Sequence, residues 1–272
     1  MGPSVLRRFR IGLFLVVLTP LTLGLIPLQA IFIAISPLAA SKLPRFYHQI
    51  VARLLGIRIR VYGKPLPKGA RLFIANHMSW IDIVVLGSLL PLTFIARADM
   101  ATWPIFGLFA RLQRTIFVDR TRKMATGSAV QSISKRFADQ EAVLLFAEGT
   151  TSDGHRVLPF RSALFGAVSG AALEHHATAQ PVALAYQRRH GLPIARYARP
   201  EIAWYGDMTI LPHLNGIIAG GPLEVDVWFG EPYPQEQMAD RKALASLAQR
   251  QIRAAVAVLS RHRERPIVWP QA

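Results

Sequence analysis

The chain has 272 residues, of which 51% are hydrophobic and 18% charged, with no cysteine and a formal net charge of +16. This composition excludes a disordered chain, because enough apolar surface is present to offset the entropy of ordering. It also excludes a disulfide scaffold and thiol catalysis. The mean hydropathy of +0.28 is high for a soluble protein.

The apolar excess lies near the N-terminus, where no charged residue occurs between Ile11 and Ala40. As a single helix this stretch would be about 45 Å long, against about 30 Å of hydrocarbon in a bilayer. Pro20, Pro27 and Pro37 each favour a kink or a break. The segment therefore predicts a membrane anchor in residues 1–45, either one kinked span or a re-entrant hairpin of two short helices. A cleaved signal peptide fits less well, because the apolar stretch is too long.

Basic residues flank this apolar segment on both sides. Those before it are Arg7, Arg8 and Arg10, and those after it are Lys42, Arg45, Arg53, Arg58 and Arg60. Because basic flanks favour the cytoplasmic side of a membrane, the hairpin is the preferred interpretation. It predicts that the residues on both sides of the apolar segment lie on the cytoplasmic side of the membrane.

Beyond the anchor, short apolar runs alternate with helical stretches. Strands are predicted at 57–62, 71–75, 93–96, 115–118, 142–147, 181–186 and 223–230. Helices are predicted at 80–90, 103–112, 122–138, 162–175 and 235–263. This alternation predicts an α/β fold with a central, mostly parallel sheet flanked by helices, in one domain over residues 46–272.

The net charge of +16 predicts a binding partner that carries negative charge. Of the 32 basic residues, 26 are arginine. The guanidinium group of arginine can form two parallel hydrogen bonds to a phosphate or carboxylate group, which the ammonium group of lysine cannot. Nucleic acid is not the expected partner, because the sequence has no helix-turn-helix spacing, zinc-finger ligands or aromatic RNA-binding signature. A basic body beside a membrane anchor indicates contact with a lipid surface.

A histidine and an aspartate follow the second predicted strand, in the segment ANHMSWIDI. Five residues turn a regular helix by about 500°, so His77 and Asp82 can meet only if His77 precedes the helix or lies in its first turn. A histidine oriented by a carboxylate is suited to activate a hydroxyl group. The alternative is structural, with Ser79 and Asp82 forming a capping box and His77 playing no part.

A second candidate segment is VLLFAEGTTSDG, in which an apolar strand ends in a small polar turn. The backbone N–H groups and hydroxyls of such a turn can bind an anionic or polar head group. A plain strand-to-loop connection is the alternative. Gly149 and Gly154 have the spacing of the two glycines in a nucleotide-binding P-loop. His155 and Arg156, however, occupy the positions where a P-loop requires lysine and then serine or threonine, so nucleotide binding is not expected.

These segments, in this order, resemble the glycerolipid acyltransferase family typified by 1-acylglycerol-3-phosphate acyltransferases. That family carries Asn-His-x-x-x-x-Asp, then an Arg after a strand, then Phe-Pro-Glu-Gly-Thr-Arg-Ser, then a Val-Pro or Pro-Val strand. The matching residues lie between about 50 and 230 and are Asn76, His77, Asp82, Phe117, Arg120, Phe146, Glu148, Gly149, Thr150, Ser152 and Pro181.

The resemblance implies a role for each matched site. His77 is expected to be the general base that deprotonates an acceptor hydroxyl, and Asp82 to orient it. The hydroxyl then attacks an acyl thioester without an acyl-enzyme intermediate, and neither a metal nor another cofactor is implied. The expected substrate-binding residues are Asn76, Arg120, Glu148, Gly149, Thr150, Thr151 and Arg161.

Two positions depart from the family pattern. Ala147 replaces the usual proline, and Thr151 replaces an arginine that would be a phosphate ligand.

The segments FAEGTTSDG, RVLPFRSALFGA and RYARPEIAWYGDMTILPHL resemble the branch that acylates lyso-ornithine lipid. That resemblance implies a 3-hydroxyacyl amide as acceptor and an acyl carrier protein, or CoA, as thioester donor. Acyl carrier proteins are acidic, which suits the basic chain. A lysophosphatidate acceptor is the alternative, with Arg156 or Arg161 as the phosphate contact.

Other function classes have weaker support. His175 and His176 are adjacent rather than at the spacing of helical zinc ligands, and no His-Glu-x-x-His occurs. The Gly-x-Ser-x-Gly of serine hydrolases is absent. The non-enzymatic alternative is a basic module that binds a membrane surface, in which His77 and Asp82 are structural.

Overall fold

The computed structural model describes residues 3–118 and 127–261. In that part of the chain eight strands form one sheet in the order β1-β8-β6-β2-β5-β3-β4, with β7 beside β6. Their bounds are β1 Ile57–Tyr62, β2 Arg71–Ala75, β3 Leu92–Arg97, β4 Ile116–Val118, β5 Ala142–Phe146, β6 Thr178–Arg189, β7 Leu192–Pro193 and β8 Leu223–Phe229. Among the described strands, only the pairs of β6 with β8 and with β7 are antiparallel. The predicted mostly parallel sheet is therefore confirmed.

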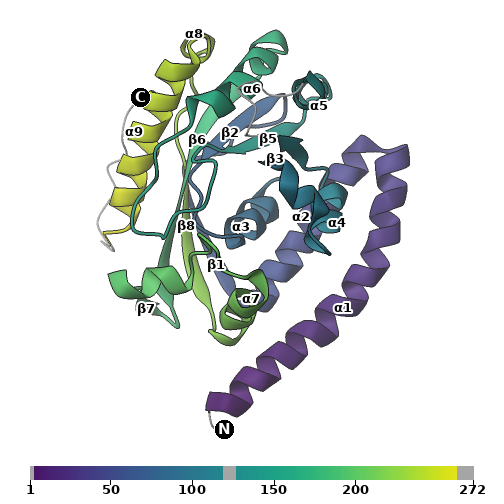
Figure 1. Ribbon diagram of the computed structural model, residues 1–272, viewed down its shortest axis with the longest axis vertical. Coiled ribbons are helices and arrows are strands. Elements are labelled where there is room, and N and C mark those ends of the chain that lie inside the picture. The colour runs from purple at the N-terminus through teal and green to yellow at the C-terminus, as the bar shows by residue number, and fades with distance from the viewer. Residues whose placement is uncertain (1–2, 119–126, 262–272) are drawn as a thin grey trace.

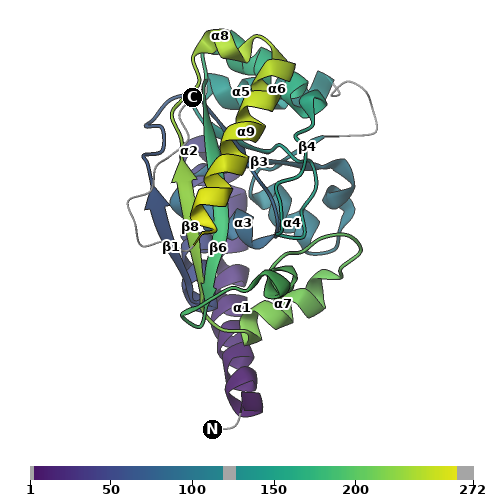
Figure 2. The ribbon, with the colours of Figure 1, turned by 90° about the vertical axis from the view of Figure 1, so that its left-hand side faces the viewer.

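Helices cover both faces of the sheet (Figures 1 and 2). One face packs against α5 (Gly127–Ala138), α6 (Ser162–Glu174) and α9 (Arg241–Leu259), and the other against α2 (Pro37–Leu55) and α3 (Ile81–Leu89). Alternate residues of each strand face opposite sides, so β2 sends Leu72 and Ile74 into the first layer and Phe73 into the second. Strands buried on both faces read as continuous apolar runs, which is why they were predictable.

The predicted elements differ from the observed ones mainly in their bounds. The expected helix over 235–263 is wrong as a single element: α8 (Gln235–Met238) and α9 are separate helices. Asp240 causes the break, because its carboxylate accepts from the N–H groups of Lys242 and Ala243 and so begins a new helix. The predicted helix over 122–138 begins among residues outside the described ones. Five elements among the described residues were not predicted: α2, β7, the 3-10 turns η1 (Ala98–Thr102) and η2 (Arg196–Glu201), and α7 (Ile210–Ala219).

The N-terminal apolar segment is one continuous helix, α1 (Pro3–Ile35), with Pro20 and Pro27 inside it. Two short apolar helices within residues 11–40, the preferred interpretation, therefore do not occur in this structure. Among the described residues, Val5–Ile35 is the one helix long and apolar enough to cross a membrane, and little of it is buried. It is a candidate membrane anchor, and its topology in a bilayer stays a prediction.

The chain reverses after α1, at Ser36, and α2 runs back beside it (Figure 1). Pro37 disfavours helical geometry at the residue before it, and the Ser36 hydroxyl caps α2 by accepting from Ala39 N–H. The buried Gln29 of α1 donates to the carbonyls of Ala40 and of Leu112, which ends α4 (Phe106–Leu112). Gln29, the most polar side chain of the apolar segment, thus joins α1 to α2 and α4 by hydrogen bonds. The predicted boundary between residues 45 and 46 falls inside α2.

Candidate active site

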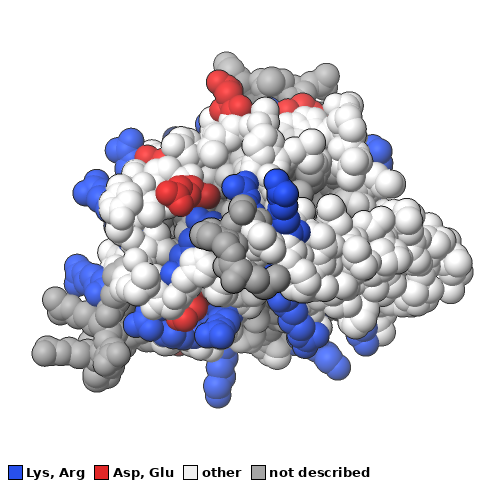
Figure 3. Space-filling view, turned by 90° about the horizontal axis from the view of Figure 1, so that it is seen from below, with Lys and Arg blue, Asp and Glu red and all other residues white. Residues whose placement is uncertain are grey.

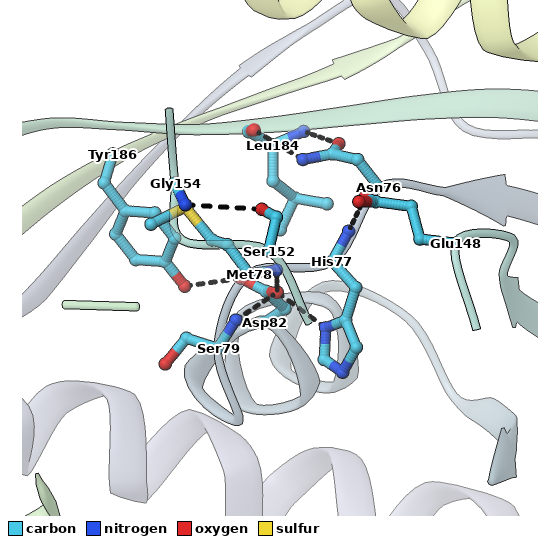
Figure 4. Close-up of polar contacts among 10 residues, drawn as sticks. All are labelled: Asn76, His77, Met78, Ser79, Asp82, Glu148, Ser152, Gly154, Leu184 and Tyr186. Atoms are coloured by element: carbon cyan, nitrogen blue, oxygen red, sulfur yellow. Dashed lines mark hydrogen bonds and ion pairs between the residues drawn. The ribbon is translucent and has the colours of Figure 1, made fainter. Parts of the chain in front are cut away.

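The candidate site lies where β2 ends and α3 begins. His77 is in the loop between them, and Asp82 is the second residue of α3. Nδ1 of His77 lies 2.8 Å from Oδ2 of Asp82 (Figure 4). A carboxylate oxygen can only accept, so Nδ1 donates and Nε2 keeps a free lone pair. This is the arrangement that the sequence requires if the two side chains are to meet.

The Asp82 carboxylate is fully buried and collects four donors. Its Oδ2 accepts from His77 and from the N–H groups of Met78 and Ser79, and its Oδ1 accepts from the hydroxyl of Tyr186. The bond from Ser79 N–H is half of the capping box considered above. The other half is missing, because the Ser79 hydroxyl has no hydrogen-bond partner within the described residues. The hydrogen bonds of Asp82 therefore fit a residue that orients His77 better than they fit a complete capping box.

Glu148 holds the loop that carries His77. Its Oε1 accepts from His77 N–H and its Oε2 from Leu158 N–H, both at 2.7 Å. Burial raises the pKa of Glu148 from its ordinary 4.5 to about 8; the two N–H groups lower the pKa and the nearby Asp82 raises it. Both oxygens are engaged by the backbone. This geometry gives Glu148 a structural task, and its contact with an acceptor stays a prediction.

Asn76 also has a structural task. Its amide donates to the carbonyl of Leu184 and accepts from the N–H of the same residue, joining the end of β2 to β6. Ser152 N–H donates to the His77 carbonyl from the other side of the loop. The His77 backbone is thereby bonded through both its N–H and its C=O. The predicted substrate contact of Asn76 stays a prediction.

An apolar cavity of about 400 Å³ opens beside the His77 ring. Its walls come from α1, α2, α3, α4, α7 and β3, and from residues between these elements; they include the aromatic side chains of Trp80, Trp103, Phe109 and Trp204. The His77 ring stacks on Phe146, with centroids 3.8 Å apart. His77 thus lies on the border between a buried polar network and a space suited to a lipid chain.

The glycine-bearing turn lines the same cavity with Gly149, Thr150 and Thr151. Gly149 has a φ of +71°, which favours glycine. A Cβ at this position would lie 3.0 Å from Cδ of Arg161, so the arginine side chain lies across the turn. The Arg161 side chain has no hydrogen bond or ion pair to another described residue, and the residue is exposed. Arg120 lies outside the described residues.

Sequence reasoning missed two parts of the site. Tyr186 ends a predicted strand at the same edge of the sheet as His77, and that position was the available signal. The role of α1 as a cavity wall, through Phe14 and Leu18, was missed because apolar anchor residues carry no sign of packing against a catalytic domain.

Comparison with known proteins agrees with this geometry. A family model described as "Acyltransferase" matches residues 58–185. A lyso-ornithine lipid O-acyltransferase of Brucella abortus is 45% identical over 92% of this chain and 95% of its own length. A 1-acyl-sn-glycerol-3-phosphate acyltransferase of Neisseria gonorrhoeae is 30% identical over 72% of this chain and 73% of its own.

The fold also has a counterpart among solved structures. The crystal structure of the 1-acyl-sn-glycerophosphate acyltransferase of Thermotoga maritima matches 97% of both chains with a TM-score of 0.62, at 17% identity. The fold, the ordered motifs and the extent of the sequence match agree, and the chain belongs to the acyltransferase family.

Proposed function

We propose that this acyltransferase acylates the hydroxyl group of lyso-ornithine lipid, with an acyl carrier protein or CoA thioester as donor, at the cytoplasmic face of a bacterial inner membrane. The observation that carries the proposal is the His77–Asp82 pair at the wall of an apolar cavity. A base with a free lone pair beside a lipid-sized space is what acylation of a lipid alcohol requires.

The proposed reaction needs no covalent enzyme intermediate. Nε2 of His77 takes the proton of the acceptor hydroxyl while the oxygen attacks the thioester carbonyl. The tetrahedral intermediate then breaks its C–S bond, and the leaving thiolate takes the proton back from His77. Asp82 stabilises the imidazolium that exists between these two steps. The products are an ester and a free thiol.

Two observations favour lyso-ornithine lipid as the acceptor. The Brucella abortus relative, whose name specifies that substrate, is similar over nearly the whole chain. Thr151 occupies the position at which the glycerol phosphate enzymes resembled by this sequence carry arginine, so one phosphate ligand is missing. Arg161, beside Gly149 and without a partner among the described residues, is suited to the carboxylate of an ornithine head group and equally to a phosphate, so it is compatible with either acceptor.

The charge distribution supports an anionic partner. Seen from the N-terminal end of α1, Lys and Arg side chains gather on the face shown in Figure 3, with few acidic ones among them. Arg10 is close enough to Arg189 to lower its pKa further, although burial has the larger effect and Glu201 opposes both. Such a surface is suited to anionic lipid head groups or to an acidic carrier protein.

The test is a side-by-side assay of the purified full chain with lyso-ornithine lipid and lysophosphatidate, each with carrier-protein and CoA donors. We expect turnover of lyso-ornithine lipid and its loss by orders of magnitude in His77→Ala, with membrane association retained. A strong preference for lysophosphatidate would overturn the acceptor assignment and leave the reaction class intact. Unchanged turnover in His77→Ala would remove this histidine from the mechanism.

A further inference from the structure

The Asp82 carboxylate is held on one side by a residue from a distant part of the chain. Tyr186 lies on β6, 104 residues beyond Asp82, and its hydroxyl donates to Oδ1 at 2.6 Å. The β6 strand pairs with β2, the strand that leads directly to His77. The central sheet therefore fixes the position of this phenol relative to the site.

The donors to Asp82 are unevenly divided between its two oxygens. Three of them converge on Oδ2, the oxygen that faces His77, whereas Tyr186 is the donor to Oδ1 among the described residues. Asp82 is 0% exposed, so in the intact protein its carboxylate depends on protein donors rather than on bulk water. Burial, and then the adjacent Asp82, raise the pKa of Tyr186 well above its ordinary value, which keeps the phenol protonated as a donor.

We infer that Tyr186 is a positioning residue for the acyl-transfer reaction, which orients the Asp82 carboxylate and withdraws part of its charge from His77. This inference rests on the proposed function of the His77–Asp82 pair. The phenol touches neither substrate nor reacting atoms, and it acts only through Asp82. Its removal therefore changes turnover and the pH dependence of turnover more than it changes substrate affinity.

The chain offers a matched control for a test of this role. Tyr233 is also a buried tyrosine, and its hydroxyl donates to Oε1 of Gln251 at the same distance of 2.6 Å, next to α9 on the opposite face of the sheet. Tyr186→Phe and Tyr233→Phe both keep the ring and delete one buried hydroxyl. The loss of a buried hydroxyl is common to the two variants, whereas effects on the site belong to Tyr186 alone.

We expect Tyr186→Phe to lower kcat roughly tenfold with little change in KM, because a carboxylate that has lost its Oδ1 partner orients His77 less well, and this loss outweighs the added negative charge beside the imidazolium. The ionisable groups that face Asp82 are His77, Tyr186 and Glu148. Without the phenol, the carboxylate presents more negative charge to His77 and favours the inactive imidazolium. The acid-side midpoint of the kcat/KM profile should therefore move to higher pH in Tyr186→Phe and stay in place in Tyr233→Phe.

A second comparison avoids a buried, unpartnered carboxylate. In Asp82→Asn the Tyr186 oxygen can accept from the new amide and keep the amide oxygen toward His77. Adding Tyr186→Phe to Asp82→Asn should then lower kcat further, since the amide nitrogen loses the acceptor that fixes its end of the side chain. If Tyr186→Phe matches Tyr233→Phe in kcat and midpoint, or adds nothing to Asp82→Asn, the role of Tyr186 is overturned. A fully active His77→Ala would instead overturn the proposed base itself.

Discussion

Replacing Asp82 by asparagine removes the negative charge of the His77–Asp82 pair while preserving its hydrogen bonds. The amide oxygen can take the place of Oδ2, where it accepts from His77 Nδ1 and the N–H groups of Met78 and Ser79. The amide nitrogen then faces Tyr186, whose hydroxyl oxygen accepts. His77 keeps its tautomer, so the variant isolates the electrostatic support of the imidazolium.

The size of that support follows from Coulomb's law. Two charges about 4 Å apart at an effective dielectric of about 20 interact by about 4 kcal/mol. A barrier change of about 1.4 kcal/mol alters a rate tenfold, so the upper limit is near a thousandfold. The His77 side chain is 15% exposed, which allows some screening by solvent. We therefore expect Asp82→Asn to lower kcat by a factor of roughly 100 to 1,000.

The assay is steady-state acyl transfer to lyso-ornithine lipid in detergent micelles, with kcat and KM determined separately for wild type and Asp82→Asn. Thermal unfolding of both proteins shows whether the fold is retained. A variant that folds normally and loses only acceptor affinity, at unchanged kcat, would refute the electrostatic role of Asp82.

Three further predictions concern the turn beside the cavity. Thr151→Arg should increase turnover of lysophosphatidate relative to lyso-ornithine lipid, because arginine supplies a bidentate phosphate ligand. An unchanged ratio of the two turnover rates in the two-acceptor assay would show that residue 151 does not determine which head group is accepted. Gly149→Ala should lower the free energy of unfolding by about 1–2 kcal/mol because its φ is +71°, as measured by chemical denaturation; equal stability would show that the turn relaxes. Glu148 binds a proton in the folded state up to a pKa of about 8 and loses it near 4.5 when unfolded, so the wild-type free energy of unfolding should fall as pH rises across that range. Glu148→Gln does not titrate, so the same pH series should show a smaller fall, and parallel curves would assign the pH dependence to another group.

Much of the fold was accessible from the sequence because buried parallel strands are continuous apolar runs. The strand from Arg71 to Ala75 was predicted with its observed bounds, and the one that ends at Phe146 to within a residue. The break at Asp240 was missed because a helical pattern continues on both sides of it, and only the cap distinguishes two helices from one.

The candidate site was predictable where its residues are close in sequence, and less so where they come from distant strands. His77 and Asp82 are five residues apart, and the geometry of a helix start limits how they can meet. Tyr186 reaches Asp82 only through the pairing of β6 with β2, a contact that no local pattern encodes. Likewise, a carboxylate such as Glu148 gives no sign in the sequence of whether it faces substrate or backbone.

The place of α1 in the structure has a practical consequence for anyone who wants a water-soluble form of this enzyme. The outer side chains of this helix are exposed, and its inner ones, among them Phe14 and Leu18, line the cavity beside His77. Deletion of the hydrophobic N-terminus would remove one wall of this cavity. Replacing exposed residues such as Val16 and Leu23 by polar ones is the better route to solubility, because it leaves the side chains that line the cavity unchanged.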